Sequence, residues 1–230
     1  MTAGIEQHAL LRRSETQEAG WIRDQRTPGV VLFVLAAQFM TAIMLAASMA
    51  PAYDMGGGAI SDLGVVPETA VLFNVSLIVT GLLNVVAGSL LYIERRSLLL
   101  LGVYVAAGAG ALGAGLVPLD RGDLHGLFAL AAFLFFNIQA IASSRIAEGP
   151  MRVVSVLAGV VGLVFVVVMV IGDAGTVAVF GPIGHGGAER MIVYPVMLWL
   201  LAFGGYLMAR SPSVVQHERE MGSRPASTPR

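Results

Sequence analysis

"MRVVSVLAGVVGLVFVVVMVIG", residues 151–172, decides the fold of this chain. After Arg152, the stretch runs for about 20 residues without a charge, the length with which an α-helix crosses a hydrocarbon core about 30 Å thick. Lipid offers no partners for backbone polar groups, and a helix satisfies those groups internally. The stretch therefore predicts a transmembrane helix.

Five further apolar runs of similar length predict five more membrane helices. They cover residues 29–51, 68–93, 97–117, 124–146 and 191–209. The composition agrees, because 56% of the 230 residues are hydrophobic and 13% are charged, whereas about a quarter of a typical soluble domain is charged. We predict an all-α polytopic membrane protein with six transmembrane helices in one bundle over residues 28–210.

Two polar segments flank the predicted bundle. Residues 1–27 are expected to form a cytoplasmic extension, and residues 211–230, rich in Pro, Ser and Arg, a disordered cytoplasmic tail. Ser48, Met49 and Ala50 have the small-x-small pattern of a signal-peptide cleavage site. We favour a retained helix, because the run before them is longer than a usual signal-peptide core and a long polar segment precedes it.

The arginines predict the orientation in the membrane. All 14 basic residues are arginine, and 12 of them lie in the segments on one side of the six runs. The other side has only Arg121 and Arg190. Because cytoplasmic segments carry the excess of positive charge, both termini are predicted to be cytoplasmic. The expected location is the plasma membrane, as a multi-pass protein.

Charge and cysteine content exclude several classes of partner and site. The formal net charge is −1 and there is no basic run, so we expect no nucleic-acid partner. The chain has no cysteine, which excludes a disulfide framework, a thiol nucleophile and thiolate metal ligands. No cofactor is predicted, and nothing in the sequence indicates an oligomeric state.

The predicted outer segments collect most of the remaining polar chemistry. They hold these acids and histidines: Asp54, Asp62, Glu68, Asp120, Asp123, His125, Asp173, His185 and Glu189. The helices expected over 68–93, 124–146 and 191–209 all begin on this side, and their free N–H groups favour an anion such as a lipid phosphate. Arg121 and Arg190 could complete such a site. The alternative is that Glu68 and Asp123 simply cap their helices.

Specific contacts are also expected. Asp62 is predicted to accept a hydrogen bond from Tyr53 or to pair with Arg190, and His125 to pair with Asp120. At membrane depth we expect interhelical hydrogen bonds. The residues concerned are Gln38, Asn74, Asn84, Asn137 and Gln139.

The order of these motifs resembles a known family. The motifs are Ser61-Asp62-Leu63-Gly64, Phe73-Asn74, His125 at the start of the fourth helix, Glu189-Arg190 and Tyr194-Pro195. This pattern, over roughly residues 28–210, is similar to the prokaryotic six-helix membrane proteins catalogued as domain of unknown function 998. The resemblance implies a six-helix integral membrane protein without an established activity.

Three functions remain open at this level. The first is binding, and possibly transport, of a lipid head group or small polar ligand on the outer face, with membrane lipids as partners. The second is a structural or accessory subunit whose polar cluster fastens the outer loops. The third is a membrane hydrolase with His125 or His185 as base, Ser61 as nucleophile and an outer carboxylate, or with those histidines and carboxylates holding a metal ion. The candidate ligand-binding residues are Ser61, Asp62, Asn74, His125, His185, Glu189, Arg190 and Tyr194.

Overall fold

The computed structural model describes residues 26–210. The predicted extension and tail therefore lie outside the described residues, apart from positions 26 and 27. The long helices are α2 (Arg26–Met49), α3 (Ala70–Arg95), α4 (Leu98–Leu116), α5 (Asp123–Ser143), α6 (Gly149–Asp173) and α7 (Gly184–Ala209). Three short 3-10 helices join them: η1 (Ser61–Gly64), η2 (Leu119–Arg121) and η3 (Val177–Ile183).

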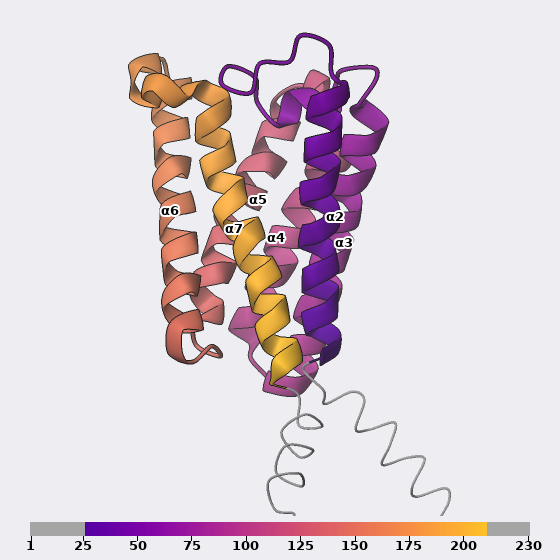
Figure 1. Cartoon of the computed structure of the whole chain (residues 1–230), viewed down its shortest axis with the longest axis vertical. Helices are drawn as coiled ribbons and strands as arrows, with labels where there is room; N and C mark the ends of the chain where they lie inside the picture. The colour runs from indigo at the N-terminus through magenta and orange to yellow at the C-terminus, as the bar shows by residue number, and fades with distance from the viewer. Residues whose placement is uncertain (1–25, 211–230) are drawn as a thin grey trace, which may run out of the picture.

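The six long helices form one bundle in chain order. Each packs against its neighbours in sequence, α2 packs against α7 to close the ring, and α5 also contacts α7. Figure 1 shows the helices running alternately up and down the long axis. Residues 50–69, 117–122 and 174–183 lie together at one end, which we call the polar end. The opposite end, where α2 begins and α7 ends, is called the terminal end.

The fold class predicted from the sequence is confirmed. All six long helices are long and apolar enough to cross a membrane, and residues 26–210 contain no strand. Because the number of long helices is even, α2 begins and α7 ends on the same side of the bundle. The side of the membrane on which each end lies stays a prediction from the arginine count.

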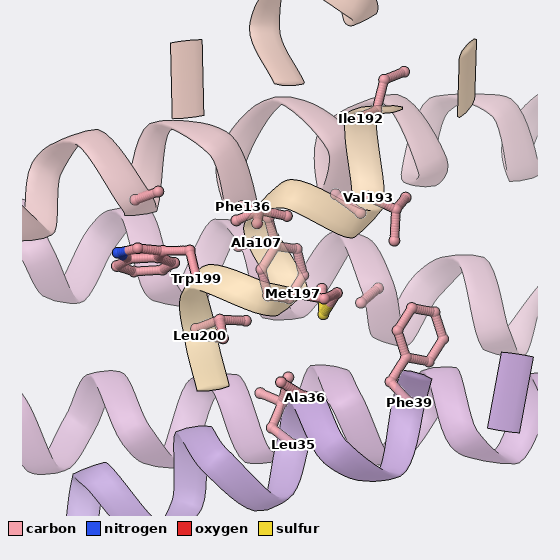
Figure 2. Close-up of a cluster of buried hydrophobic side chains, with 14 of the residues drawn as sticks. Leu35, Ala36, Phe39, Ala107, Phe136, Ile192, Val193, Met197, Trp199 and Leu200 are labelled. Carbon is pink, nitrogen blue, oxygen red and sulfur yellow. The ribbon is translucent and has the colours of Figure 1, made fainter. Parts of the chain in front are cut away.

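Helix α7 supplies much of the core. Figure 2 shows Val193 and Met197 of α7 between α2, which contributes Leu35, Ala36 and Phe39, and the α4–α5 side, which contributes Ala107 and Phe136. All of these side chains are buried. Helix α7 therefore packs against several helices at once. This packing fixes the position of the polar residues in its first turns relative to the whole bundle.

Polar pairs also join the helices within the membrane. Asn84 and Gln139 exchange hydrogen bonds of 2.8 and 3.0 Å, each amide donating to the other side chain. Gln38 donates to Thr80 over 2.7 Å. Asn137 donates to the carbonyl of Ile192 over 3.2 Å. These bonds confirm the expectation for four of the five residues.

Candidate functional site

The polar end differs from the sequence prediction at the start of α7. The last helix was expected to begin near residue 191, after a glycine-rich loop, but it begins at Gly184. Gly184 has a positive φ of 69°, which glycine adopts at little cost. Gly186 lets the helix approach a neighbouring loop, since its N–H donates to the Gly56 carbonyl over 2.9 Å. His185, Glu189 and Arg190 are therefore helical residues.

Arg190 fastens the segment between α2 and η1. It is 7% exposed. Its Nη1 donates to the carbonyls of Met55, Gly58 and Gly186 over 2.7, 3.0 and 2.8 Å, and its Nη2 donates to the Tyr53 hydroxyl over 2.6 Å. The expected pairing of Arg190 with Asp62 is wrong, because its terminal nitrogens donate to carbonyls and a phenol instead.

Glu189, next to Arg190, holds the following residues of the same segment. Its carboxylate accepts hydrogen bonds from the Ile60 N–H over 2.6 Å and from the Ser61 hydroxyl over 2.9 Å. The side chain is 3% exposed. Charged acceptors make stronger hydrogen bonds than neutral ones, so Glu189 fixes the start of η1 against α7.

The acids of this segment, residues 53–64, mostly bind their own backbone. Asp62 accepts from the Ala59 N–H over 2.8 Å, and Asp54 accepts from the Gly56 and Gly57 N–H groups. Those two hydrogen bonds hold the pKa of Asp54 below its ordinary value. The expected bond from Tyr53 to Asp62 is also wrong, since the Tyr53 hydroxyl donates to the Ala59 carbonyl over 2.6 Å.

His125, on the first turn of α5, has one free ring nitrogen. Its Nδ1 lies 2.7 Å from the Val117 carbonyl. A carbonyl can only accept, so Nδ1 carries the proton and Nε2 presents a lone pair. The ring is 3% exposed, and Nε2 is buried without a hydrogen-bond partner among the described residues. The expected pairing of His125 with Asp120 is wrong, because the Val117 carbonyl takes that place.

A cleft of about 450 Å³ opens beside this imidazole. Its walls come from α5, α6 and α7, and the segment Ala59–Asp62 closes one side. The polar lining residues are Ser61, Asp62, His125, Asp173, His185 and Glu189. The apolar ones are Ala59, Leu119, Ala129, Leu130, Phe133, Val166, Met169, Val170 and Ile192.

A narrower cavity of about 50 Å³ adjoins the cleft. It shares Ser61, His125 and Glu189 with the cleft and reaches Asn137 on α5. The Asn137 Oδ1 is buried and has no partner among the described residues. A buried water needs about 10–15 Å³ of cavity volume, so this cavity has room for a few water molecules. We call it the inner cavity.

Two groups lie together at the mouth of the cleft. His185 Nε2 is 3.1 Å from an Asp173 carboxylate oxygen, and both side chains are partly exposed. The His185 ring also meets the Phe180 ring edge-on, with 5.2 Å between the centroids. This pair ties the end of α6 to the start of α7.

Residues 33–206 match the family model described as "Protein of unknown function (DUF998)". The chain belongs to the DUF998 family. No curated protein and no solved structure matches it. The family therefore agrees with the six-helix membrane architecture of this DUF998 chain and adds no activity to it.

The structure of this DUF998 protein separates the candidate residues into three groups. Ser61, Asp62, His125, His185 and Glu189 line the cleft. Arg190 lies behind the cleft and fastens residues 53–58, as described above.

Asn74 and Tyr194 lie elsewhere. Asn74 donates to the Gly64 carbonyl over 2.8 Å, at the C-terminal end of η1. Tyr194 is partly buried and packs against the hydrophobic core. The N-cap residues of α3 and α5 are Thr69 and Gly122, so neither Glu68 nor Asp123 is the cap residue of its helix, and Asp123 lies in the first turn of α5.

Two kinds of ligand site considered from the sequence, a metal site within the hydrolase alternative and an anion site with both arginines, do not assemble in the part of the chain that is described. Within residues 26–210, no three His, Asp or Glu side chains are placed to hold a metal ion. Arg121 lies next to Asp120 on the exposed surface, and neither it nor Arg190 lines the cleft. Sequence reasoning missed the apolar walls, because positions such as Phe133, Val166 and Met169 look like any lipid-facing residue of a membrane helix.

Proposed function

We propose that this DUF998 protein binds an amphipathic small molecule or lipid in the cleft at the polar end of the bundle. One observation carries the proposal. The Nε2 of His125 is a buried hydrogen-bond acceptor without a protein partner, and it belongs to a residue that lines the cleft. An unpaired buried polar atom costs about 1–3 kcal/mol, and a ligand that donates to Nε2 would remove this cost.

The size and lining of the cleft support the same conclusion. Its volume of about 450 Å³ falls within the ~300–1,000 Å³ of small-molecule sites. Such sites combine apolar walls with a few fixed polar groups, and this cleft has that composition. With the orientation predicted from the arginines, the cleft would open at the outer leaflet of the plasma membrane.

The accessory-subunit alternative explains only part of the polar end. Glu189 and Arg190 do fasten residues 53–61, as that alternative requires. Fastening does not use His125 Nε2, and it does not fill the cleft. We therefore assign Glu189 and Arg190 to positioning the cleft wall and His125 to contact with the ligand.

The hydrolase alternative finds less support in the hydrogen bonds. The Ser61 hydroxyl donates to Glu189, and His125 Nδ1 binds the Val117 carbonyl. A serine nucleophile needs a base within hydrogen-bond reach, itself oriented by a third group. His125 is oriented in this way, but the hydrogen bond of Ser61 goes to another residue.

Two matched glycine variants test ligand binding. No atom lies within 4 Å of a Cβ added at Gly126 or at Gly102. Gly126 lines the cleft, whereas Gly102 is an exposed residue of α4. Gly126→Leu should fill the cleft, and Gly102→Leu makes the same chemical change elsewhere.

The readout is bound mass, measured by native mass spectrometry of the full chain extracted in mild detergent. We expect a discrete amphiphile adduct on the wild type and on Gly102→Leu, and its loss from Gly126→Leu. An adduct that persists unchanged in Gly126→Leu contradicts the proposal, as does a wild-type protein that binds no added amphiphile.

A further inference from the structure

We infer that the ligand of this cleft carries an ammonium group on an apolar tail. This inference rests on the proposed function and names the chemical class of the ligand. It replaces the anionic lipid phosphate expected from the sequence, and it depends on three features of the cleft.

The first feature is the direction of the free hydrogen bond. In the neutral imidazole, with Nδ1 donating to the Val117 carbonyl, Nε2 is the acceptor. Asn137, which lines the inner cavity, also has an acceptor without a partner among the described residues, its Oδ1, although this atom packs against Gly162 of α6. A ligand must therefore present donors, which ammonium has and which ionised phosphate monoesters and carboxylates lack.

The second feature is the charge of the walls. The described lining residues include three acids, Asp62, Asp173 and Glu189, and no arginine. The lining residue His185 lies beside one of these acids, with its Nε2 3.1 Å from Asp173. An anion placed here would face like charges, which costs several kcal/mol at a binding site.

The third feature is the direction of the two arginine side chains at the polar end. The Nη atoms of Arg190 donate to three carbonyls and to the Tyr53 hydroxyl. Arg121 lies beside Asp120, and its side chain is 74% exposed. The cations that would recognise a phosphate are therefore turned away from the cleft.

The apolar walls determine the rest of the ligand. Seven lining positions on α5, α6 and α7 are apolar, among them Phe133, Val166 and Met169. They offer a surface for an alkyl or ring system, while the polar lining comes from η1, the first turn of α5, the last residue of α6 and the first two turns of α7. A long-chain amine has both parts.

Three probes with the same tail test the inference on the full-length wild type. Decylamine, 1-decanol and decanoate are titrated at pH 7 in an uncharged detergent, and each bound fraction is read by native mass spectrometry. We expect decylamine to bind at least about tenfold more tightly than decanoate, as hydrogen bonds to charged groups and like-charge repulsion predict.

Variants at His125 separate the two ring nitrogens. His125→Asn keeps a donor near the Nδ1 position, for the Val117 carbonyl, and removes the Nε2 acceptor. His125→Gln reaches the Nε2 position with an acceptor and lacks the Nδ1 donor. Decylamine binding should fall at least about fivefold in His125→Asn and be partly kept in His125→Gln.

The outcomes distinguish failure of the inference from failure of the proposed function. Decanoate that binds as tightly as decylamine, and is lost in Gly126→Leu, overturns the ammonium inference and leaves the cleft as a binding site. Binding of all three probes that is unchanged in Gly126→Leu overturns the proposed function itself. A preference for decylamine that Asp62→Asn with Asp173→Asn removes supports the inference.

Discussion

The buried carboxylate of Glu189 accepts a hydrogen bond of 2.6 Å from the backbone N–H of Ile60, 129 positions earlier in the chain. This contact joins the start of α7 to the segment that precedes η1. The neighbouring Ser61 hydroxyl donates to the other oxygen of the same carboxylate. One wall of the cleft is thus positioned by a residue from the last helix.

Replacing Glu189 by Gln should loosen this wall. The amide oxygen of Gln can accept one of the two hydrogen bonds, and its NH₂ group would then face the other donor. We expect a loss of stability of about 1–3 kcal/mol and faster hydrogen exchange at the Ile60 amide. Thermal unfolding and exchange mass spectrometry measure the two effects. Unchanged exchange at Ile60 would show that the carboxylate is not needed there.

Replacing Arg190 by Lys should have a similar local effect for a different reason. A lysine ammonium keeps the charge but is a point donor, and it cannot reproduce the planar fork that reaches both Met55 and Tyr53. We expect faster exchange and easier proteolysis of residues 53–58 than in the wild type. Arg95→Lys is the control, since Arg95 lies at the terminal end, where it is 3.8 Å from its neighbour Glu94. Equal effects of the two variants would contradict the role of Arg190.

Gly186 tests the close approach of α7 to the preceding loop. A Cβ added there would lie 2.0 Å from the Gly58 carbonyl oxygen, so Gly186→Ala must push the loop away. Overpacking of this kind costs about 1–3 kcal/mol. No atom lies within 4 Å of a Cβ added at Gly205 of the same helix, and Gly205→Ala is the matched control. Melting temperatures should separate the two, and a stable Gly186→Ala would refute the tight contact.

The sequence was sufficient for the architecture because the six apolar runs are a long-range pattern with a clear physical cause. It was also sufficient to collect the polar residues of three loops at one end. It could not predict their pairing. Nη1 of Arg190 donates to the carbonyls of residues 55, 58 and 186, while its buried Nε has no partner among the described residues. Backbone acceptors look the same at every position of a sequence.

The start of α7 shows a second limit. Four glycines between 181 and 187 favour a loop by propensity, and the apolar run predicted a helix only from residue 191. In the structure, Gly184 and Gly186 serve the contact with residues 56–58 instead, and the helix begins early. Tertiary packing overrode local preference at the place where the candidate site is built.

The terminal end provides a prediction for pH dependence. Arg210 Nη2 lies 2.8 Å from Glu148 Oε2 and lowers the pKa of that carboxyl below its ordinary value. A lowered pKa in the folded state stabilises the protein above the ordinary pKa of the carboxyl, and this stabilisation is lost as the pH falls through the folded value. Glu148→Gln should therefore narrow the stability difference between neutral pH and acid pH. Melting curves from pH 7 to pH 3 measure this, and parallel curves for both proteins would contradict it.

The reciprocal pair of Asn84 and Gln139 gives the last prediction, on the polar contacts inside the membrane. Both side chains are fully buried, and each donates to the other. Asn84→Leu removes one partner of Gln139, whose side chain also makes a hydrogen bond with Tyr104, whereas Asn84→Leu with Gln139→Leu removes both members of the pair. A double-mutant cycle should give a coupling of about 0.6–1.7 kcal/mol, the range for interhelical hydrogen bonds in membranes. Each residue also contacts Tyr104, since the Asn84 amide donates to its carbonyl over 2.8 Å and the Gln139 side chain makes a hydrogen bond with its hydroxyl, so both single variants should be destabilised. Reversible unfolding in mixed micelles measures all four proteins, and a coupling of zero would mean that the pair adds nothing beyond its separate contacts.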